Sequence, residues 1–171
     1  MITIDDGFKS GLKGAVPILF EFGFSAIFFV YTDYIGVSDK ALTWQDLRRL
    51  KSDGFYIGSH STSHSDLSRK LEGETNDGYR KRLYKEIVVS KQTIDRKLNQ
   101  NTTIFSFPYG RYTKHVMALS KDAGYEMAVT VERGANPFFS NPLALKRDMI
   151  LNKDIKTFQT RLHTFNKLSL K

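Results

Sequence analysis

The stretch Phe55-Tyr56-Ile57-Gly58-Ser59-His60-Ser61-Thr62-Ser63-His64 is the most informative part of the chain, because an apolar run leads directly into two histidines four residues apart. We predict a short strand over residues 55–57 that delivers both imidazoles. Zinc accepts neutral imidazole nitrogen, and histidines at i and i+4 on one helical turn can point at a single ion. Catalysis also needs a third ligand and an open position, and the acidic pair Asp5-Asp6 can supply the rest. The stretch therefore predicts a metal site at the end of a strand.

Length and composition indicate one globular domain. The chain has 171 residues, enough for a single sizeable core, and 40% of them are hydrophobic and 26% charged. No cysteine is present, which excludes disulfides and thiolate zinc ligands, so any metal must be bound by histidine and carboxylate. We therefore expect residues 1–171 to form a single domain. The first strand before Asp5 is unusually short, which favours an N-terminus trimmed from a longer domain.

The formal net charge of +8 raises nucleic acid, an anionic membrane or an acidic polymer as partners. Lysines and arginines are dispersed, and no basic stripe interleaved with aromatic residues accompanies them, so we predict no nucleic-acid partner. No apolar run is long enough to span a bilayer, and no secretory signal is visible, so we predict no transmembrane segment. The oligomeric state is left open.

Strand-like and helix-like segments alternate along the whole chain, which is typical of a parallel α/β arrangement. We predict strands over residues 2–4, 25–31, 55–57, 103–107 and 125–131, with a last strand within 143–151. We predict helices over residues 11–22 (with Pro17 as a flaw), 43–51, 76–98, 115–123 and 154–162. Residues 25–31 are continuously apolar, as a strand buried on both faces should be.

Three polar signatures directly follow predicted strands: Asp5-Asp6-Gly7, His60 to His64, and Pro108-Tyr109-Gly110. In parallel α/β folds the C-terminal ends of the strands converge on one face, where sites are built. Successive aspartates on a regular strand point to opposite faces, so both can serve one site only where the strand breaks, and we expect Gly7 to supply that break. The three segments are therefore expected to meet.

These motifs resemble those of the polysaccharide deacetylases, also called the NodB-homology domain or carbohydrate esterase family 4. Thr3-Ile4-Asp5-Asp6-Gly7 resembles that family's T-F-D-D-G motif, and His60-Ser61-Thr62-Ser63-His64 resembles its H-S/T-x-x-H motif. The segment 105–110 resembles the aromatic-proline-aromatic-glycine turn that walls the site. Each motif alone is weak, but their order and spacing together are specific. The resemblance covers most of the chain and implies an α/β fold, a distorted (β/α) barrel of about seven parallel strands.

The resemblance also implies a role for each motif residue. Asp6, His60 and His64 would hold a divalent metal, with zinc as the expected ion. Asp5 would act as general base, which agrees with the need for a carboxylate beside the ligands that takes the proton of an acidified water. The oxyanion would be stabilised by the metal and the backbone N–H of Tyr109.

The sequence departs from the family pattern at several places. The third motif often carries an arginine two residues before the proline, which orients the base, and here that position is Ser106. Arg147 is our candidate to enter from the opposite side in its place. The fourth motif, with its Asp-Trp character, is not visible. The fifth motif supplies a leucine-x-histidine that protonates the leaving amine; Leu162-His163 lacks the intervening residue, and we take His163 as the candidate acid.

We therefore predict a metal-dependent hydrolase that removes N-acetyl groups from N-acetylglucosamine-containing polysaccharide, such as poly-N-acetylglucosamine, peptidoglycan or a chitin-like polymer. One alternative is a degenerate carbohydrate-binding module that keeps the fold and the metal without turnover. Another is a deacetylase of acetylated xylan or of a small amide. We expect an exported or cell-surface protein whose signal or anchor lies outside this chain, with a cytoplasmic location as the alternative.

Overall fold

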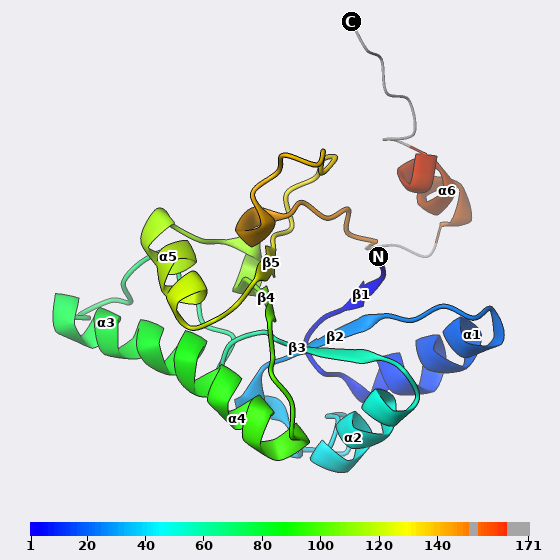
Figure 1. Ribbon diagram of the computed structural model, residues 1–171, viewed down its shortest axis with the longest axis horizontal. Coiled ribbons are helices and arrows are strands. Elements are labelled where there is room, and N and C mark those ends of the chain that lie inside the picture. Colours follow the sequence, from blue (N-terminus) through cyan, green and yellow to red (C-terminus); the bar gives the residue numbers. More distant parts are fainter. Residues whose placement is uncertain (151–153, 164–171) are drawn as a thin grey trace, which may run out of the picture.

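Five parallel strands form one sheet in the computed structural model, which describes residues 1–150 and 154–163 (Figure 1). They lie side by side in sequence order, each paired with the next: β1 (Thr3–Ile4), β2 (Ile27–Val30), β3 (Tyr56–Ser59), β4 (Ile104–Ser106) and β5 (Met127–Val129). The predicted parallel α/β class is confirmed, and the sheet is a half-barrel.

The prediction of about seven strands is not met by the described residues, which form five. The last strand predicted within 143–151 is reduced to one parallel bridge between Leu145 and Val129. A short 3-10 turn, η5 (Pro142–Ala144), precedes this bridge. After the bridge the Arg147 N–H donates to Glu132 O rather than to β5, so the ladder stops there. Residue 151 lies outside the described residues.

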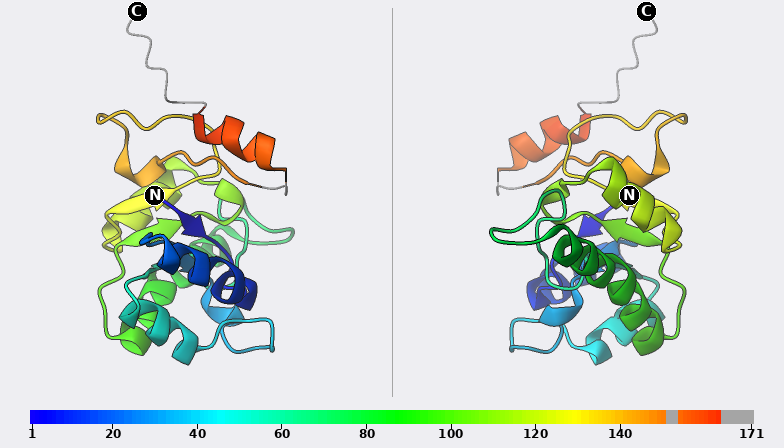
Figure 2. Two further views of the ribbon diagram at one scale, coloured as in Figure 1. Left: turned by 90° about the vertical axis from the view of Figure 1, so that its right-hand side faces the viewer. Right: turned by 90° about the vertical axis from the view of Figure 1, so that its left-hand side faces the viewer.

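Helices connect the strands and cover the sheet (Figures 1 and 2). Their bounds are η1 (Gly11–Ala15), α1 (Val16–Glu21), η2 (Thr32–Tyr34), α2 (Trp44–Ser52), α3 (Asn76–Tyr84), η3 (Lys85–Val89), α4 (Ser90–Leu98), η4 (Pro108–Gly110), α5 (Lys114–Asp122) and α6 (Ile155–His163). Among the described helices, none combines the length and apolarity that a membrane crossing requires.

Local sequence signals account for where several helices begin. Thr43 caps α2 through a capping box with Asp46, as predicted. Pro17 falls in the first turn of α1, where its missing N–H leaves no unmet hydrogen bond. The predicted first helix is divided there into a π-helical segment, η1, and the α-helix α1. The helix predicted over 76–98 is confirmed as the continuous run of α3, η3 and α4, in which η3 is a π-helical segment.

The core lies mainly between the sheet and its helices. All four residues of β2 are buried, as the sequence predicted. Alternate side chains point to opposite faces, so Phe28 and Val30 pack toward the helices, whereas Ile27 and Phe29 form a small cluster on the other face. Gly58 is required on β3, because a Cβ there would lie 2.5 Å from the Phe29 ring.

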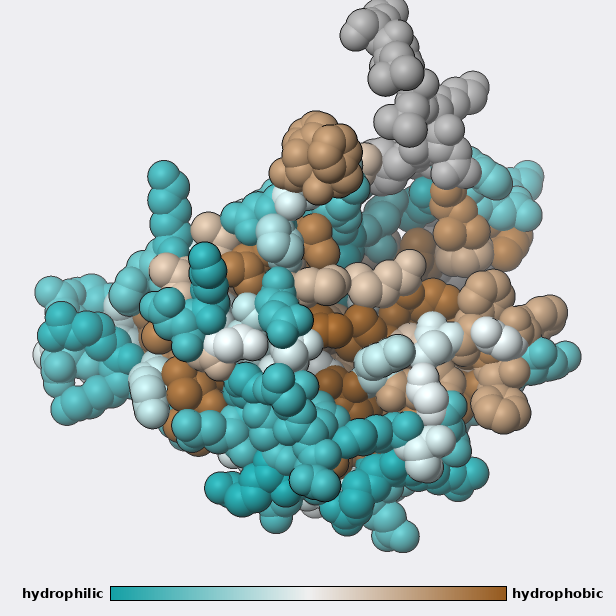
Figure 3. Space-filling model, in the orientation of Figure 1, coloured by the Kyte–Doolittle hydropathy of each residue, from teal (hydrophilic) through white to brown (hydrophobic). Residues whose placement is uncertain are grey.

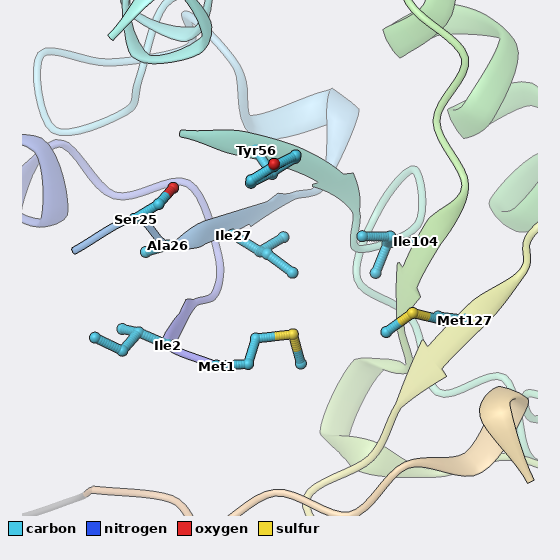
Figure 4. A pocket seen from close by; sticks show the side chains of 8 residues that line it. All are labelled: Met1, Ile2, Ser25, Ala26, Ile27, Tyr56, Ile104 and Met127. Carbon is cyan, nitrogen blue, oxygen red and sulfur yellow. The ribbon is translucent and has the colours of Figure 1, made fainter. Parts of the chain in front are cut away.

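The N-terminal ends of the strands surround an apolar hollow of about 230 Å³ (Figure 4). Its lining comes from the starts of successive strands: Met1, Ile2, Ser25, Ala26, Ile27, Tyr56, Ile104 and Met127. Figure 3 shows hydrophilic side chains over α2 and α4 and an apolar surface over α1. Exposed side chains in and just after α1 include Ile18, Phe20, Phe22 and Phe24. The polar motifs lie at the other ends of the strands.

An ion pair organises the long loop that follows the second histidine. Glu74 accepts hydrogen bonds from Arg82 Nε at 2.8 Å and Nη2 at 2.9 Å, and each of these side chains is only 12% exposed. Arg82 also donates to the backbone carbonyls of Asp66 and Arg69. The hydrogen bond from Arg82 lowers the pKa of Glu74 to about 2.

We expect Glu74→Gln to lower the free energy of unfolding at neutral pH and to make that stability less dependent on acid. Because the folded-state pKa of Glu74 is depressed, its contribution is complete above its ordinary pKa of 4.5 and is lost as the pH falls toward about 2. Urea unfolding of wild type and variant across this range measures the difference. The exposed Glu72→Gln is the control, and a wild-type advantage that persists at the lowest pH would contradict the prediction.

Candidate metal centre and carboxylate pair

Three predicted ligands lie together beyond the C-terminal ends of β1 and β3. The ligand atoms of Asp6, His60 and His64 are all within 4.8 Å of one another. Asp6 Oδ1 lies 3.5 Å from His60 Nε2 and 3.4 Å from His64 Nε2. Zinc with bonds near 2 Å holds tetrahedral ligands about 3.3 Å apart, so this donor set fits one such ion.

The backbone at this cluster is strained. Within the described residues, five non-glycine residues have positive φ, and four belong to the three motifs: Asp6 (75°), Ser61 (74°), His64 (61°) and Tyr109 (57°). Each such conformation costs on the order of 1 kcal/mol or more and persists only where surrounding contacts determine it. Strain therefore concentrates at the candidate site.

The i, i+4 spacing of the histidines does not work through a helical turn, as the sequence had suggested. His60 follows β3 directly, and the left-handed residues Ser61 and His64 make residues 60–64 a compact loop. We call this segment the histidine loop. The break after β1 likewise begins at Asp6 itself and continues through Gly7, so Gly7 does not supply it alone as predicted. Both corrections concern backbone that tertiary contacts determine.

His60 is held in one orientation. Its side chain is 3% exposed, and its Nδ1 lies 2.7 Å from the carbonyl oxygen of Ser106, so Nδ1 carries the proton and donates it. Nε2 is then the lone-pair nitrogen that faces the aspartates. Burial lowers the pKa of His60 despite the opposing effect of Asp5, which favours the neutral form that a metal requires.

Asp5 lies beside the ligand cluster and is paired with Arg147. The guanidinium binds both carboxylate oxygens, with Nη1 to Oδ1 at 2.9 Å and Nη2 to Oδ2 at 2.8 Å. Asp5 Oδ2 is 3.9 Å from His60 Nε2. The arginine predicted to enter from a late segment is therefore in contact with the predicted base.

Ser106 links the two charged groups. Its hydroxyl donates to Asp5 Oδ2 at 3.2 Å and accepts from Arg147 Nη2 at 2.9 Å. Burial raises the pKa of Asp5, but the hydrogen bond and the charge of Arg147 outweigh it, and the net pKa lies below the ordinary value. Asp5 is thus held as a carboxylate next to the metal ligands.

Tyr109 packs against the cluster at His64. Its ring lies edge-to-face on His64 with centroids 4.6 Å apart, and the residue is 55% exposed. Gly110 follows at φ 67°, and a Cβ there would lie 2.5 Å from the backbone nitrogen of Val131, so the turn requires glycine. Proposed oxyanion binding by the Tyr109 N–H stays a prediction.

His163, the predicted acid, is the last residue of α6 and is exposed. Figures 1 and 2 both draw α6 above the start of β1. Its role in proton transfer stays a prediction.

Sequence reasoning missed two polar residues at this site. It treated Ser106 only as a missing arginine, although the hydroxyl joins Asp5 to Arg147. It also passed over Glu86, a 2%-exposed carboxylate that contacts the histidine loop. The available signal was its position: Glu86 sits three residues after Leu83, on the apolar stripe of the long helix, where a charge needs partners.

Comparisons with known proteins agree with the geometry. The family model described as polysaccharide deacetylase matches residues 1–128. YxkH of Bacillus subtilis (strain 168), which carries a polysaccharide deacetylase name, is 32% identical over 135 residues, covering 79% of this chain and 45% of that protein. The poly-beta-1,6-N-acetyl-D-glucosamine N-deacetylase of Escherichia coli (strain K12) is 24% identical, covering 99% of this chain and 30% of that protein.

A solved structure gives the same answer for the fold. The Streptococcus pyogenes deacetylase PplD in complex with acetate matches with a TM-score of 0.79 and 27% identity, covering 87% of this chain and 63% of that chain. The chain spans less than half the length of the curated relatives it matches.

We expect alanine at Asp6, His60 or His64 to reduce zinc bound at equilibrium to well below one ion per chain. Each change removes one of three protein ligands. Dialysis against buffered zinc followed by elemental analysis measures the content, and Asp5→Asn is the matched control because Asp5 lies outside the ligand set. Equal zinc content in all four variants would contradict the assignment.

We expect Arg147→Ala to reduce the rate of any hydrolysis in which Asp5 acts as the base about 10- to 100-fold, as loss of an orienting partner outside the ligand shell typically does. Arg147→Lys should recover only part of that loss, because lysine keeps the charge but cannot bind both oxygens of Asp5. Steady-state kinetics should place the effect in kcat rather than KM. An unchanged kcat in Arg147→Ala would exclude the orienting role.

Proposed function

The chain belongs to the polysaccharide deacetylase family, and on this premise we propose that it is a metal-dependent hydrolase that removes N-acetyl groups from an N-acetylglucosamine-containing polysaccharide. One observation carries the proposal: a carboxylate outside the ligand set, Asp5, lies 3.9 Å from His60 Nε2 and is bound through both oxygens by Arg147. Amide hydrolysis at a metal centre requires such a base.

Each residue of the site has a distinct role in the proposed reaction. A divalent cation bound by Asp6, His60 and His64 would acidify a water and polarise the acetyl carbonyl. Asp5 takes the proton of the attacking water, and Arg147 keeps its carboxylate ionised and oriented. The Ser106 carbonyl fixes the His60 ring with Nε2 toward the cluster.

A hollow next to Tyr109 supports a polymeric substrate. Its volume is about 620 Å³, within the size range of small-molecule sites, and its lining mixes aromatic and polar side chains, including Tyr112, Arg111 and Glu132. Because Tyr109 borders both His64 and this hollow, a glycan can place one sugar at the metal and a neighbouring sugar in the hollow. Hydroxyl-rich sugars suit such a lining.

Among N-acetylated glycans we favour β-1,6-linked poly-N-acetylglucosamine, because the Escherichia coli relative named for that substrate aligns over 99% of this chain. Peptidoglycan and chitin-like polymers are the nearest alternatives, followed by acetylated xylan or a small amide. The proposal places the protein at the cell surface, where such polymers accumulate.

A metal-holding module that binds glycans without turnover is the rival from another class. Ser106 in place of the family arginine, together with the imperfect match of Leu162-His163 to the acid motif, makes this rival credible. The Arg147 contacts weigh against it, because Asp5 has a bidentate partner despite that substitution.

We expect the zinc-loaded protein to release acetate from oligosaccharides of β-1,6-linked N-acetylglucosamine, and Asp5→Asn to lower the rate at least about 100-fold by removing the general base. An enzyme-coupled acetate assay measures both. The exposed Asp39→Asn is the matched control and should retain wild-type rates. Chito-oligosaccharides, acetylated xylan and an aryl acetate ester form the comparison panel.

Glycan binding without acetate release from any member of the panel, unaffected by Asp5→Asn, would establish the non-catalytic module instead. The same assay tests His163→Gln, whose predicted loss of rate should be recovered by substrates with a better leaving group, such as the aryl ester.

A further inference from the structure

We propose that Glu86 is a positioning residue for the metal centre, because its buried carboxylate holds the histidine loop in the conformation that aims His60 and His64 at Asp6. Glu86 lies on the π-helical segment η3, far from the motifs in sequence. The proposal rests on the metal site assigned above and is independent of which glycan is hydrolysed.

The carboxylate binds the loop through three hydrogen bonds. Glu86 Oε2 accepts from the backbone N–H of Thr62 and of Ser63, both at 2.9 Å, and Oε1 accepts from Ser63 Oγ at 2.6 Å. These donors occupy the middle of the histidine loop, between its two imidazoles. Glu86 therefore fixes the segment that sets the separation of His60 from His64.

Because Glu86 is buried, its hydrogen bonds to the histidine loop are energetically necessary. Glu86 is 2% exposed, and a buried carboxylate is tolerated only when donors compensate for the lost water. The donors come from a loop in which Ser61 and His64 have positive φ, a strained arrangement. The charge-assisted bonds to Glu86 offset that strain, because they form only when the loop N–H groups converge.

The π-helical segment and the first residue of α4 make further contacts with the histidine loop and with the end of β3. Thr62 Oγ1 donates to the carbonyl oxygen of Lys85 at 2.8 Å, next to Glu86 on the same segment. One turn further on, the Ser90 hydroxyl accepts from Ser59 Oγ at 3.0 Å, just before the loop. Local π-helical turns occur frequently at functional sites. Here η3 supports the histidine loop through hydrogen bonds from Thr62 to Glu86 and Lys85.

A purely structural role would lower stability without a specific effect on metal binding. The chain offers a matched comparison on the same helix, since Asp95 Oδ1 accepts from the Thr102 N–H at 2.7 Å and so also holds loop backbone, away from the site. Glu86→Ala and Asp95→Ala both remove a carboxylate that binds a loop amide. Only the first change should alter the metal centre.

The experiment titrates cobalt(II) into metal-free wild type, Glu86→Ala, Glu86→Gln and Asp95→Ala, with chelator competition for affinity and the visible absorption bands for ligand geometry. We expect Glu86→Ala to weaken cobalt binding about 10- to 100-fold and to change the bands. Glu86→Gln should show a smaller but measurable loss, because its amide oxygen can still accept from the Thr62 and Ser63 N–H groups, whereas its NH2 group cannot accept from Ser63 Oγ. Asp95→Ala should lose thermal stability but bind cobalt within about twofold of wild type.

Cobalt affinity and bands in Glu86→Ala and Glu86→Gln that match wild type would overturn the positioning role while leaving the proposed function intact. The same loss of affinity in Asp95→Ala would also overturn it, because the effect would then follow from stability. Should Glu86→Ala fail to fold, Glu86→Gln decides alone, through a changed or an unchanged spectrum. Wild type that binds no cobalt or zinc would remove the metal site itself and this inference with it.

Discussion

The bidentate pair between Arg147 and Asp5 is the contact on which the site depends. Arg147 follows the bridge beyond β5, and Asp5 follows β1, so the guanidinium joins the two edges of a sheet that strand pairing leaves open in the described residues. It also binds Thr3 Oγ1 and the Thr130 carbonyl, and it lies over the Phe29 ring at 5.6 Å. The same guanidinium therefore sets both the orientation of Asp5 and the spacing of the sheet edges.

A second constraint is backbone strain that only tertiary contacts can hold. The left-handed residues at the site lie on three separate segments, and each segment is fixed by a neighbour distant in sequence. Glu86 binds the histidine loop, Arg147 binds Asp5, and Val131 packs against Gly110. Because rigid ligands lose less freedom when an ion binds, this arrangement favours tight, specific coordination.

These two constraints explain what the sequence could predict. Alternating patterns identified the parallel α/β class, and local signals located the α2 capping box and the long helix, because each depends on neighbours within a few residues. Motif order and spacing also predicted that Asp6, His60 and His64 would lie together, as they do. Local sequence did not predict the loop form of residues 60–64, because the distant Glu86 helps to determine it. It also did not predict that the strand ladder ends after Leu145, where the Arg147 N–H donates to Glu132 instead.

Ser106 does not leave Asp5 without an arginine partner, because Arg147 supplies the guanidinium from another place in the chain. An arginine at 106 would extend toward Asp5 from β4, whereas serine is short enough to leave that space to a guanidinium arriving from the other edge of the sheet. The Ser106 hydroxyl then accepts a hydrogen bond from Arg147 and donates one to Asp5, so it is satisfied on both sides. A module that only bound glycans would not need its spare carboxylate oriented through both oxygens. Binding of both Asp5 oxygens by Arg147 is useful where Asp5 must accept a proton in a defined direction.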